Sequence, residues 1–176
     1  LSVLTEPHHF GGSLQDLAQA RASVDLPLLQ KDFIVDRSQI QEASSLGADA
    51  ILLIVAMLER EELRSLMASA EELGLSVLTE VHSREELELA VELGARMIGV
   101  NNRNLHTLEI SLDVSRDLIT HLPKTALAIC ESGITSPQEV SEFSGLGFDG
   151  FLIGSAFMKH RSPHSALREL IAGVSP

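Results

Sequence analysis

The chain has 176 residues, of which 44% are hydrophobic, and this length and composition fit one domain with a sizeable core. Its formal net charge of -12 disfavours nucleic acid or an anionic membrane as a partner. No apolar run reaches the roughly 18 to 20 residues of a membrane span, and the first residues lack a signal-peptide pattern. A single cysteine, Cys130, cannot form an internal disulfide, so we expect a buried free thiol and a reducing, cytoplasmic location.

Short apolar runs alternate with helix-like segments along the whole chain. Each run is too short for an ordinary helix and stops at small or polar residues, as buried strands do. The predicted strands end near Thr5, Lys31, Val55, Glu80, Val100, Glu131 and Gly154. The predicted helices begin near Ser13, Ser38, Leu58, Ser83 and Leu112, and a last one runs from Ser165 to Gly173. This alternation indicates an α/β fold with a parallel sheet covered on both faces.

A doubly wound open sheet and a closed barrel both fit this alternation. The first is disfavoured because no Gly-x-Gly-x-x-Gly fingerprint follows the first strand. The barrel is favoured because polar residues stand at nearly every strand end, where a barrel collects its catalytic groups. A full barrel has eight strands and typically at least ~200 residues. We therefore predict that residues 1–176 form a single, incomplete domain of the (β/α)8 TIM-barrel family, with seven of eight βα units and no first strand.

The last two predicted strands end in small residues that suit an anion. Ser132-Gly133 follows one strand and Gly154-Ser155 follows the other, each ahead of a helix-like segment. Backbone N–H groups at such turns, with a helix dipole behind them, favour a phosphate. In a barrel of this kind the loops after the last two strands form the usual phosphate site. The sequence therefore predicts a phosphorylated small molecule as ligand.

Three charged residues close predicted strands and could form an acid–base set. Lys31 ends an apolar run, and a partly desolvated lysine in a barrel mouth could act as a general acid or bind an anion. Glu80 and Glu131 end two other runs, where carboxylates can exchange protons with a substrate. The alternatives are a surface lysine at Lys31 and structural ion pairs at the two glutamates.

Two further polar clusters allow more than one interpretation. Asn101 and Arg103, after the fifth strand, could hold a substrate carboxylate or a ring substituent, but such a run is also ordinary turn chemistry. His8 and His9 are adjacent and lack further ligands, so we interpret them as loop residues and predict no metal site.

Seven short motifs contain these strand ends. They are Ser2-Val-Leu-Thr-Glu-Pro with a following Phe-Gly-Gly-Ser, Leu29-Gln-Lys31-Asp-Phe33-Ile, Leu52-Leu-Ile, Leu78-Thr-Glu80-Val, Ile98-Gly-Val-Asn101-Asn-Arg103-Asn-Leu, Glu131-Ser132-Gly133-Ile and Phe151-Leu-Ile-Gly154-Ser155-Ala-Phe-Met. In this order, and over the whole chain, they resemble the indole-3-glycerol phosphate synthase family.

The resemblance implies an enzyme of tryptophan biosynthesis that works without cofactor or metal. Its reaction closes the indole ring of 1-(2-carboxyphenylamino)-1-deoxyribulose 5-phosphate with loss of CO2 and water. Lys31 is implied as the general acid for the ketone oxygen, and Glu80 as the carboxylate of the later proton removal and dehydration. Asn101 and Glu131 are implied as further catalytic residues. The implied substrate-binding residues are Ser2, Phe33, Leu52, Arg103 and Ser132, and the implied phosphate-binding residues are Gly133, Gly154 and Ser155.

The chain departs from the family pattern at its start. It begins at the family's second strand, so the resemblance implies that the first strand, which supplies a catalytic glutamate and a second lysine, and the N-terminal helical extension are absent. Open strand edges at residues 2–5 and 150–153 then predict a homo-oligomer or swapped dimer and much reduced activity.

Two other functions remain as alternatives. One is a non-catalytic fragment of the barrel that binds a phosphate ligand or serves in assembly. The other is phosphoribosylanthranilate isomerase, whose Cys and Asp acid–base pair is disfavoured because the only thiol, Cys130, lies within a predicted strand.

Overall fold

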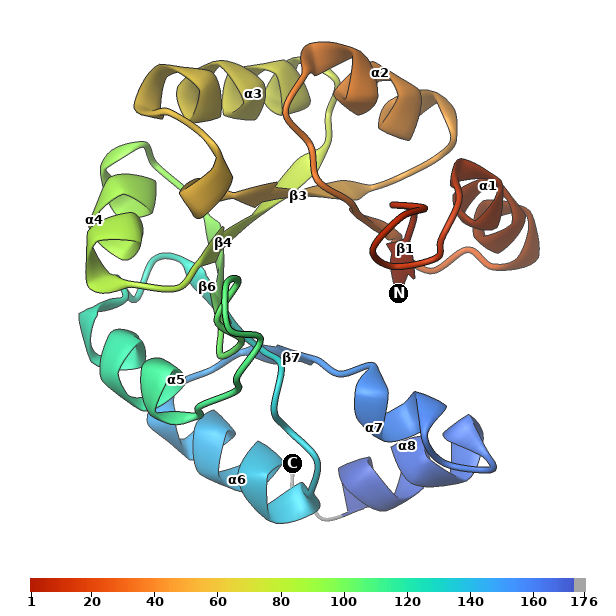
Figure 1. Cartoon of the computed structure of the whole chain (residues 1–176), viewed down its shortest axis with the longest axis vertical. Helices are drawn as coiled ribbons and strands as arrows, with labels where there is room; N and C mark the ends of the chain where they lie inside the picture. The colour runs from red at the N-terminus through yellow and green to blue at the C-terminus, as the bar shows by residue number, and fades with distance from the viewer. Residues whose placement is uncertain (173–176) are drawn as a thin grey trace. The chain divides into compact units, whose positions relative to one another are not determined.

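The structure is a computed structural model that describes residues 1–172 (Figure 1). These residues fall into two compact units, Leu1–Glu80 with Glu92–Arg96 and Val81–Val91 with the chain from Met97 onward. The prediction of a single domain stays a prediction. No helix within residues 1–172 combines the length and apolar character needed to cross a membrane.

The first unit is a parallel sheet whose strands alternate with helices. Its strands are β1 (Ser2–Leu4), β2 (Leu29–Lys31), β3 (Ala50–Ile54) and β4 (Ser76–Val81, of which all but Val81 lie in this unit), paired in that order. Its helices are α1 (Leu14–Ser23), α2 (Arg37–Ser45) and α3 (Arg60–Glu72), and a 3-10 turn, η1 (Val55–Met57), precedes α3. Figure 1 shows α1, α2 and α3 along one face of these strands. Helices on one face argue against a doubly wound sheet in this unit.

The second unit repeats the alternation with three strands. β5 (Met97–Asn101), β6 (Leu127–Glu131) and β7 (Gly150–Leu152) pair in parallel in that order. The helices are α4 (Arg84–Glu92, whose last residue belongs to the first unit), α5 (Asp113–Leu118), the 3-10 turn η2 (Ile119–His121), α6 (Pro137–Leu146), α7 (Ser155–Met158) and α8 (Pro163–Ala172). The seven predicted strands and their alternation with helices are therefore confirmed within the described residues.

Element boundaries differ from the prediction where local chemistry decides them. The strand predicted over residues 26–31 begins at Leu29, because Pro27 has no N–H to donate to a neighbouring strand. The helix predicted from Leu58 begins at Arg60, after the 3-10 turn. The last helix begins at Pro163 rather than Ser165, since proline suits the first helical turn. Its predicted end, Gly173, lies outside the described residues.

Strand pairing sorts the side chains of the first unit onto two faces. Successive side chains of a strand point to opposite faces, and paired residues of parallel neighbours share a face. Ile51 and Leu53 point toward the helices and are fully buried, and they form the centre of the core. Lys31 and Glu80 occupy the other face, because Ile54 is paired with Glu80 and Leu29 with Ala50. The register therefore separates the hydrophobic core from the candidate acid–base residues.

The burial of Leu53 predicts a large loss of stability on truncation. Leu53→Ala removes a side chain that is 0% exposed in β3, so we expect the free energy of unfolding to fall by about 2–5 kcal/mol. Urea unfolding followed by far-ultraviolet circular dichroism measures this change. Leu127→Ala is the matched control on β6, where the side chain is 54% exposed, and we expect a change within about 0.5 kcal/mol. Equal losses in the two variants would contradict the assignment of the core.

Candidate active site

A buried ion pair joins the carboxyl ends of β2 and β4. Lys31 Nζ lies 3.1 Å from Glu80 Oε2, and the two side chains are 21% and 2% exposed. Burying either charge without a partner would be costly, and the pairing offsets that cost. The pair places a proton donor and a proton acceptor at one edge of the sheet, as the sequence predicts. The same pair also ties two strand ends together, so at Glu80 the alternative of a structural ion pair stays open beside the acid–base role.

The other predicted residues of the first unit take different positions. Leu52, in β3, is 1% exposed and shares the face of Lys31, so it contributes an apolar floor. Ser2 is the first residue of β1 and is paired with Leu29, so it lies two positions before the level of Lys31. Phe33 follows β2 in a loop. The structure thus brings Lys31, Glu80 and Leu52 to one face and places Ser2 nearer the start of the strands.

The loop after β1 is held by hydrogen bonds to the Glu6 carboxylate and packs against Phe33. The carboxylate of Glu6 accepts hydrogen bonds from the backbone N–H groups of His8, at 3.0 Å, of Phe10, at 3.3 Å, and of His9. The rings of His9 and Phe10 contact Phe33, with centroids 5.8 and 5.1 Å apart. The two histidines are loop residues, as predicted. Within residues 1–172, no three histidine, cysteine or acidic side chains gather in a group that could hold a metal.

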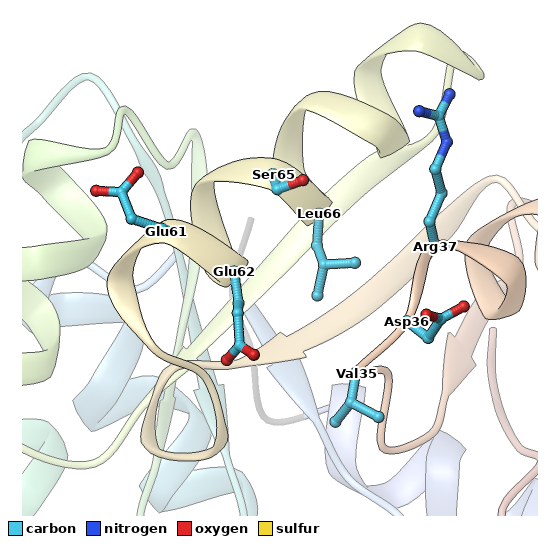
Figure 2. A pocket seen from close by; sticks show the side chains of 7 residues that line it. All are labelled: Val35, Asp36, Arg37, Glu61, Glu62, Ser65 and Leu66. Atoms are coloured by element: carbon cyan, nitrogen blue, oxygen red, sulfur yellow. The ribbon is translucent and has the colours of Figure 1, made fainter.

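Two hollows lie in the first unit. One, of about 370 Å³, is lined by Val35, Asp36, Arg37, Glu61, Glu62, Ser65 and Leu66 (Figure 2). Its charged groups serve the helices, since Asp36 caps α2, Glu62 completes the cap of α3, and Arg37 pairs with Glu72 at 2.7 Å. The other, of about 600 Å³, includes the loop after β1 and Phe33 in its lining. Phe33 is the only predicted site residue in the lining of either hollow.

In the second unit, Asn101 and Glu131 are neighbours at the ends of β5 and β6. The two residues are paired in register, and they are 8% and 2% exposed. Asn101 Oδ1 accepts a hydrogen bond from the backbone N–H of Arg103 at 3.0 Å. The Arg103 guanidinium donates to the Leu108 carbonyl at 3.1 Å, so in this structure it braces the loop between β5 and α5. The pairing places an amide and a carboxylate side by side at one strand edge.

The turn after Glu131 has an unusual backbone. Ser132 has a φ of 63° and Gly133 a φ of 90°, both in the left-handed region. A Cβ on Gly133 would lie 2.8 Å from Ile110 Cγ2 and 2.9 Å from Leu112 Cδ2, so the turn packs against the loop that follows β5. A serine in the left-handed region is held there by its surroundings, and such conformations cluster at functional sites.

The two turns of the predicted anion site leave neighbouring strands. β6 and β7 are paired, with Glu131 opposite Leu152, so Gly133 and Gly154 both follow the same edge. Gly154 directly precedes α7, as the predicted helix start requires. The first turn of α7 has no hydrogen bond from a side-chain cap. Gly133 does not directly precede a helix, because three residues separate it from Pro137, and Ser136 already caps α6. An anion at Gly133 would therefore meet turn amides rather than a helix end.

A buried polar network behind this turn was missed by sequence reasoning. Asn102, 2% exposed, donates through Nδ2 to the backbone carbonyls of Glu131 and Ser132, each at 3.0 Å. Its Oδ1 accepts from the backbone N–H of Ser115 at 3.1 Å, and its Nδ2 lies 3.4 Å from Cys130 Sγ. The available signal was a carboxamide placed one residue after a buried strand, within a run of polar residues.

The Cys130 thiol is protected by its position. Burial raises the pKa of Cys130 above its ordinary value, and the nearby charge of Glu131 adds to this, while hydrogen bonds with Ser115 and Asn102 act in the opposite direction. The side chain is 0% exposed. A protonated, enclosed thiol is a poor acid–base or nucleophilic group at neutral pH. This geometry disfavours the isomerase alternative.

Parallel strands that alternate with helices, with ionisable side chains at their carboxyl ends, define the class of TIM-barrel-like α/β proteins. Two solved structures share this fold. The 3-hexulose-6-phosphate synthase of Salmonella typhimurium matches with a TM-score of 0.81 and 19% identity, over 97% of this chain and 85% of that one. The 3-keto-L-gulonate-6-phosphate decarboxylase of Vibrio cholerae matches with a TM-score of 0.74 and 17% identity, over 99% and 86%. At these identities the likeness shows the fold alone.

The family is shown by sequence. The family model for indole-3-glycerol phosphate synthase matches residues 1–170. Indole-3-glycerol phosphate synthases of Kineococcus radiotolerans and Variovorax paradoxus are 46% and 47% identical, over 100% and 97% of this chain and 65% and 64% of theirs. The chain belongs to the indole-3-glycerol phosphate synthase family, which confirms the resemblance in its motifs. It spans about 65% of the length of these curated relatives.

The Glu6 clamp predicts an acid-sensitive loop. Burial alone would raise the pKa of Glu6, but the amides of His9, His8 and Phe10 outweigh it and lower the pKa below the ordinary value of 4.5. Stability from the charged carboxylate is then present above about pH 4.5 and is lost as the pH falls through the lowered pKa. We expect Glu6→Gln to lower the thermal midpoint at pH 7, with a difference from the unmodified chain that shrinks toward pH 3.

Glu88→Gln is the control for this titration. It removes an exposed carboxylate that lies 3.0 Å from Arg84 on one face of α4, and exposed pairs of this kind contribute little. At pH 7 we expect a smaller change than in Glu6→Gln. A difference between Glu6→Gln and the unmodified chain that persists unchanged at pH 3 would contradict the clamp.

The enclosed thiol predicts slow alkylation. Iodoacetamide at pH 7.5 should modify Cys130 in the native chain at least tenfold more slowly than in the chain unfolded in urea, because its pKa is raised and the side chain is buried. Intact mass measured over time follows the reaction. Equal rates in the native and unfolded chains would show that the thiol is accessible.

Proposed function

We propose that the chain carries the chemistry of indole-3-glycerol phosphate synthase. The substrate is 1-(2-carboxyphenylamino)-1-deoxyribulose 5-phosphate, and the products are indole-3-glycerol phosphate, CO2 and water. The observation that carries the proposal is the buried pair of Lys31 and Glu80, 3.1 Å apart at the carboxyl ends of two strands, in a chain of this family.

The pair suits the two proton transfers that the ring closure needs. As the aromatic carbon that bears the carboxylate attacks the ketone carbon, Lys31 gives a proton to the ketone oxygen. A cation beside the developing alkoxide stabilises it strongly in a site that excludes water. Loss of CO2 restores the aromatic ring. Glu80 then accepts the proton that is removed in the last step and passes it to the departing hydroxyl group, which leaves as water.

The second unit supplies the remaining roles in the proposal. Asn101 and Glu131, paired at the ends of β5 and β6, act as further catalytic residues that position the anthranilate and ribulose parts. The substrate-binding residues are Ser2, Phe33, Leu52, Arg103 and Ser132. The phosphate is held by Gly133, Gly154 and Ser155. The left-handed turn at Gly133 and the uncapped start of α7 support this, because both offer backbone N–H groups to an anion.

The finer architecture and the partners belong to the same proposal. The seven strands are seven of the eight βα units of a (β/α)8 barrel, and family membership supports this assignment. The edge strand β1 contains Leu4, which is 42% exposed, and follows Leu1, which is 61% exposed, and we propose that this edge favours a homo-oligomer or swapped dimer. A reduced, buried Cys130 is consistent with the cytoplasm as location. The second candidate function is a non-catalytic module that binds the phosphate ligand or serves in assembly.

Substitutions in the ion pair test the proposal. Lys31→Met and Glu80→Gln should each lower kcat by about 100-fold or more, because general acid–base groups typically contribute that much. The chain has no tryptophan, so the rise of indole fluorescence reports product directly. Arg37→Met is the control, since Arg37 and Glu72 form an exposed pair with side chains 57% and 62% exposed. We expect its kcat to stay within about twofold of the unmodified chain.

Two results would count against this assignment. Full turnover in both variants would remove the catalytic role of the pair. If the unmodified chain binds indole-3-glycerol phosphate and does not turn the substrate over, the binding module is the better description of this chain.

A further inference from the structure

A single buried carboxamide lies behind the turn that carries Glu131, Ser132 and Gly133. We infer that Asn102 is a positioning residue, which acts through this turn on the catalytic carboxylate and on the amides proposed to hold the phosphate. The inference rests on the proposed function and adds a residue that touches neither substrate nor product.

The hydrogen bonds of Asn102 converge on the two residues at the end of β6. Its Nδ2 donates to the carbonyl oxygens of Glu131 and Ser132, each at 3.0 Å. Its own backbone N–H also donates to the Glu131 carbonyl at 3.0 Å. Its Oδ1 accepts from the backbone N–H of Ser115, at the start of α5. Asn102 therefore connects β5, α5 and the turn after β6 through one side chain.

The turn needs such support because its backbone is in a rarely populated region. Ser132 is a non-glycine residue with a φ of 63°, which persists only where neighbouring groups fix it. Gly133 packs against Ile110 and Leu112 on one side of the turn. On another side of the turn, the carboxamide of Asn102 donates hydrogen bonds to the carbonyls of Glu131 and Ser132. Without its donor, the Ser132 carbonyl loses this hydrogen bond and the Glu131 carbonyl keeps only the one from the Asn102 backbone N–H, so the turn is free to relax.

Relaxation of this turn would move the groups that the proposed reaction uses. The Glu131 carboxylate and the Ser132 and Gly133 amides are attached to the same few backbone atoms that Asn102 holds. The Ser115 hydroxyl, by contrast, lies 3.4 Å from Cys130 Sγ, whereas the hydrogen bonds to those carbonyls come from Asn102. The side chains of Asn102 and Ser115 are similarly buried, with exposed fractions of 2% and 0%, but only that of Asn102 donates to the carbonyls of the turn.

The test compares Asn102→Asp with Ser115→Ala. The first keeps the size and the acceptor of Asn102 and replaces the donor that faces two carbonyls. Ser115→Ala removes a buried hydroxyl and keeps the backbone N–H from which Asn102 Oδ1 accepts a hydrogen bond. Turnover is measured as kcat and KM from indole fluorescence, and the geometry of the turn is measured from the amide resonances of Ser132 and Gly133. Asn102→Ala is included so that the result does not depend on an introduced carboxylate.

Both Asn102 variants should lower kcat by tenfold or more, raise KM, and shift the Ser132 and Gly133 amide resonances. Ser115→Ala should keep kcat within twofold and leave those resonances in place, although its melting temperature falls. If all three variants lose stability while kcat per folded molecule and the two amide resonances stay unchanged, Asn102 is only structural and the inference is wrong.

Failure of the proposed function gives a different result. The unmodified chain would then show no turnover and no binding of indole-3-glycerol phosphate. Binding is measured by the fluorescence anisotropy of the indole ring of this ligand. The amide resonances of the two Asn102 variants would still decide whether Asn102 holds the turn. Unshifted resonances would overturn the inference in that case as well.

Discussion

The register of the parallel strands is the constraint on which the rest of this structure depends. Because paired residues share a face, the register decides which side chains meet the helices and which meet the opposite face. Leu53 and Glu80 lie in neighbouring strands and serve opposite purposes only because their positions differ by one step in the pairing. A slip by one residue would exchange the two faces, so the buried leucines that fix the register also place the ion pair of Lys31 and Glu80.

The strand ends of the two units are stabilised by different groups. In the first, the charge of Glu80 is buried beside a cation, Lys31. In the second, a turn with a strained backbone follows the buried carboxylate of Glu131, and a neutral carboxamide, Asn102, satisfies the carbonyl groups of that turn. A neutral donor positions the backbone without adding a charge next to the carboxylate. Both arrangements connect groups at strand ends, and in both the carboxylate is almost fully buried, since Glu80 and Glu131 are each 2% exposed.

Much of this could be read from the sequence, and the reason is physical. A charge such as Lys31 or Glu80 at the end of an apolar run is conspicuous, because strand burial makes any charge there expensive. Asn102 gives no such contrast, because it stands among other polar residues and its role depends on a turn that follows another strand. The start of α6 gives no such contrast either, since both Ser132 and Ser136 are suitable residues ahead of a helix. Only the backbone shows which of the two caps the helix.

The division between the two faces of β1–β4 has a consequence for how such a chain can change over time. Residues that face the helices, such as Ile51, are fixed by packing against one another, whereas those on the other face lie near Lys31 and the candidate site. Variation on one face leaves the other largely intact. A lineage can therefore acquire new specificity at the strand ends while it inherits its foldability unchanged, and it can adapt its core to temperature without altering its chemistry. The alternation of a β-strand makes these two kinds of adaptation nearly independent.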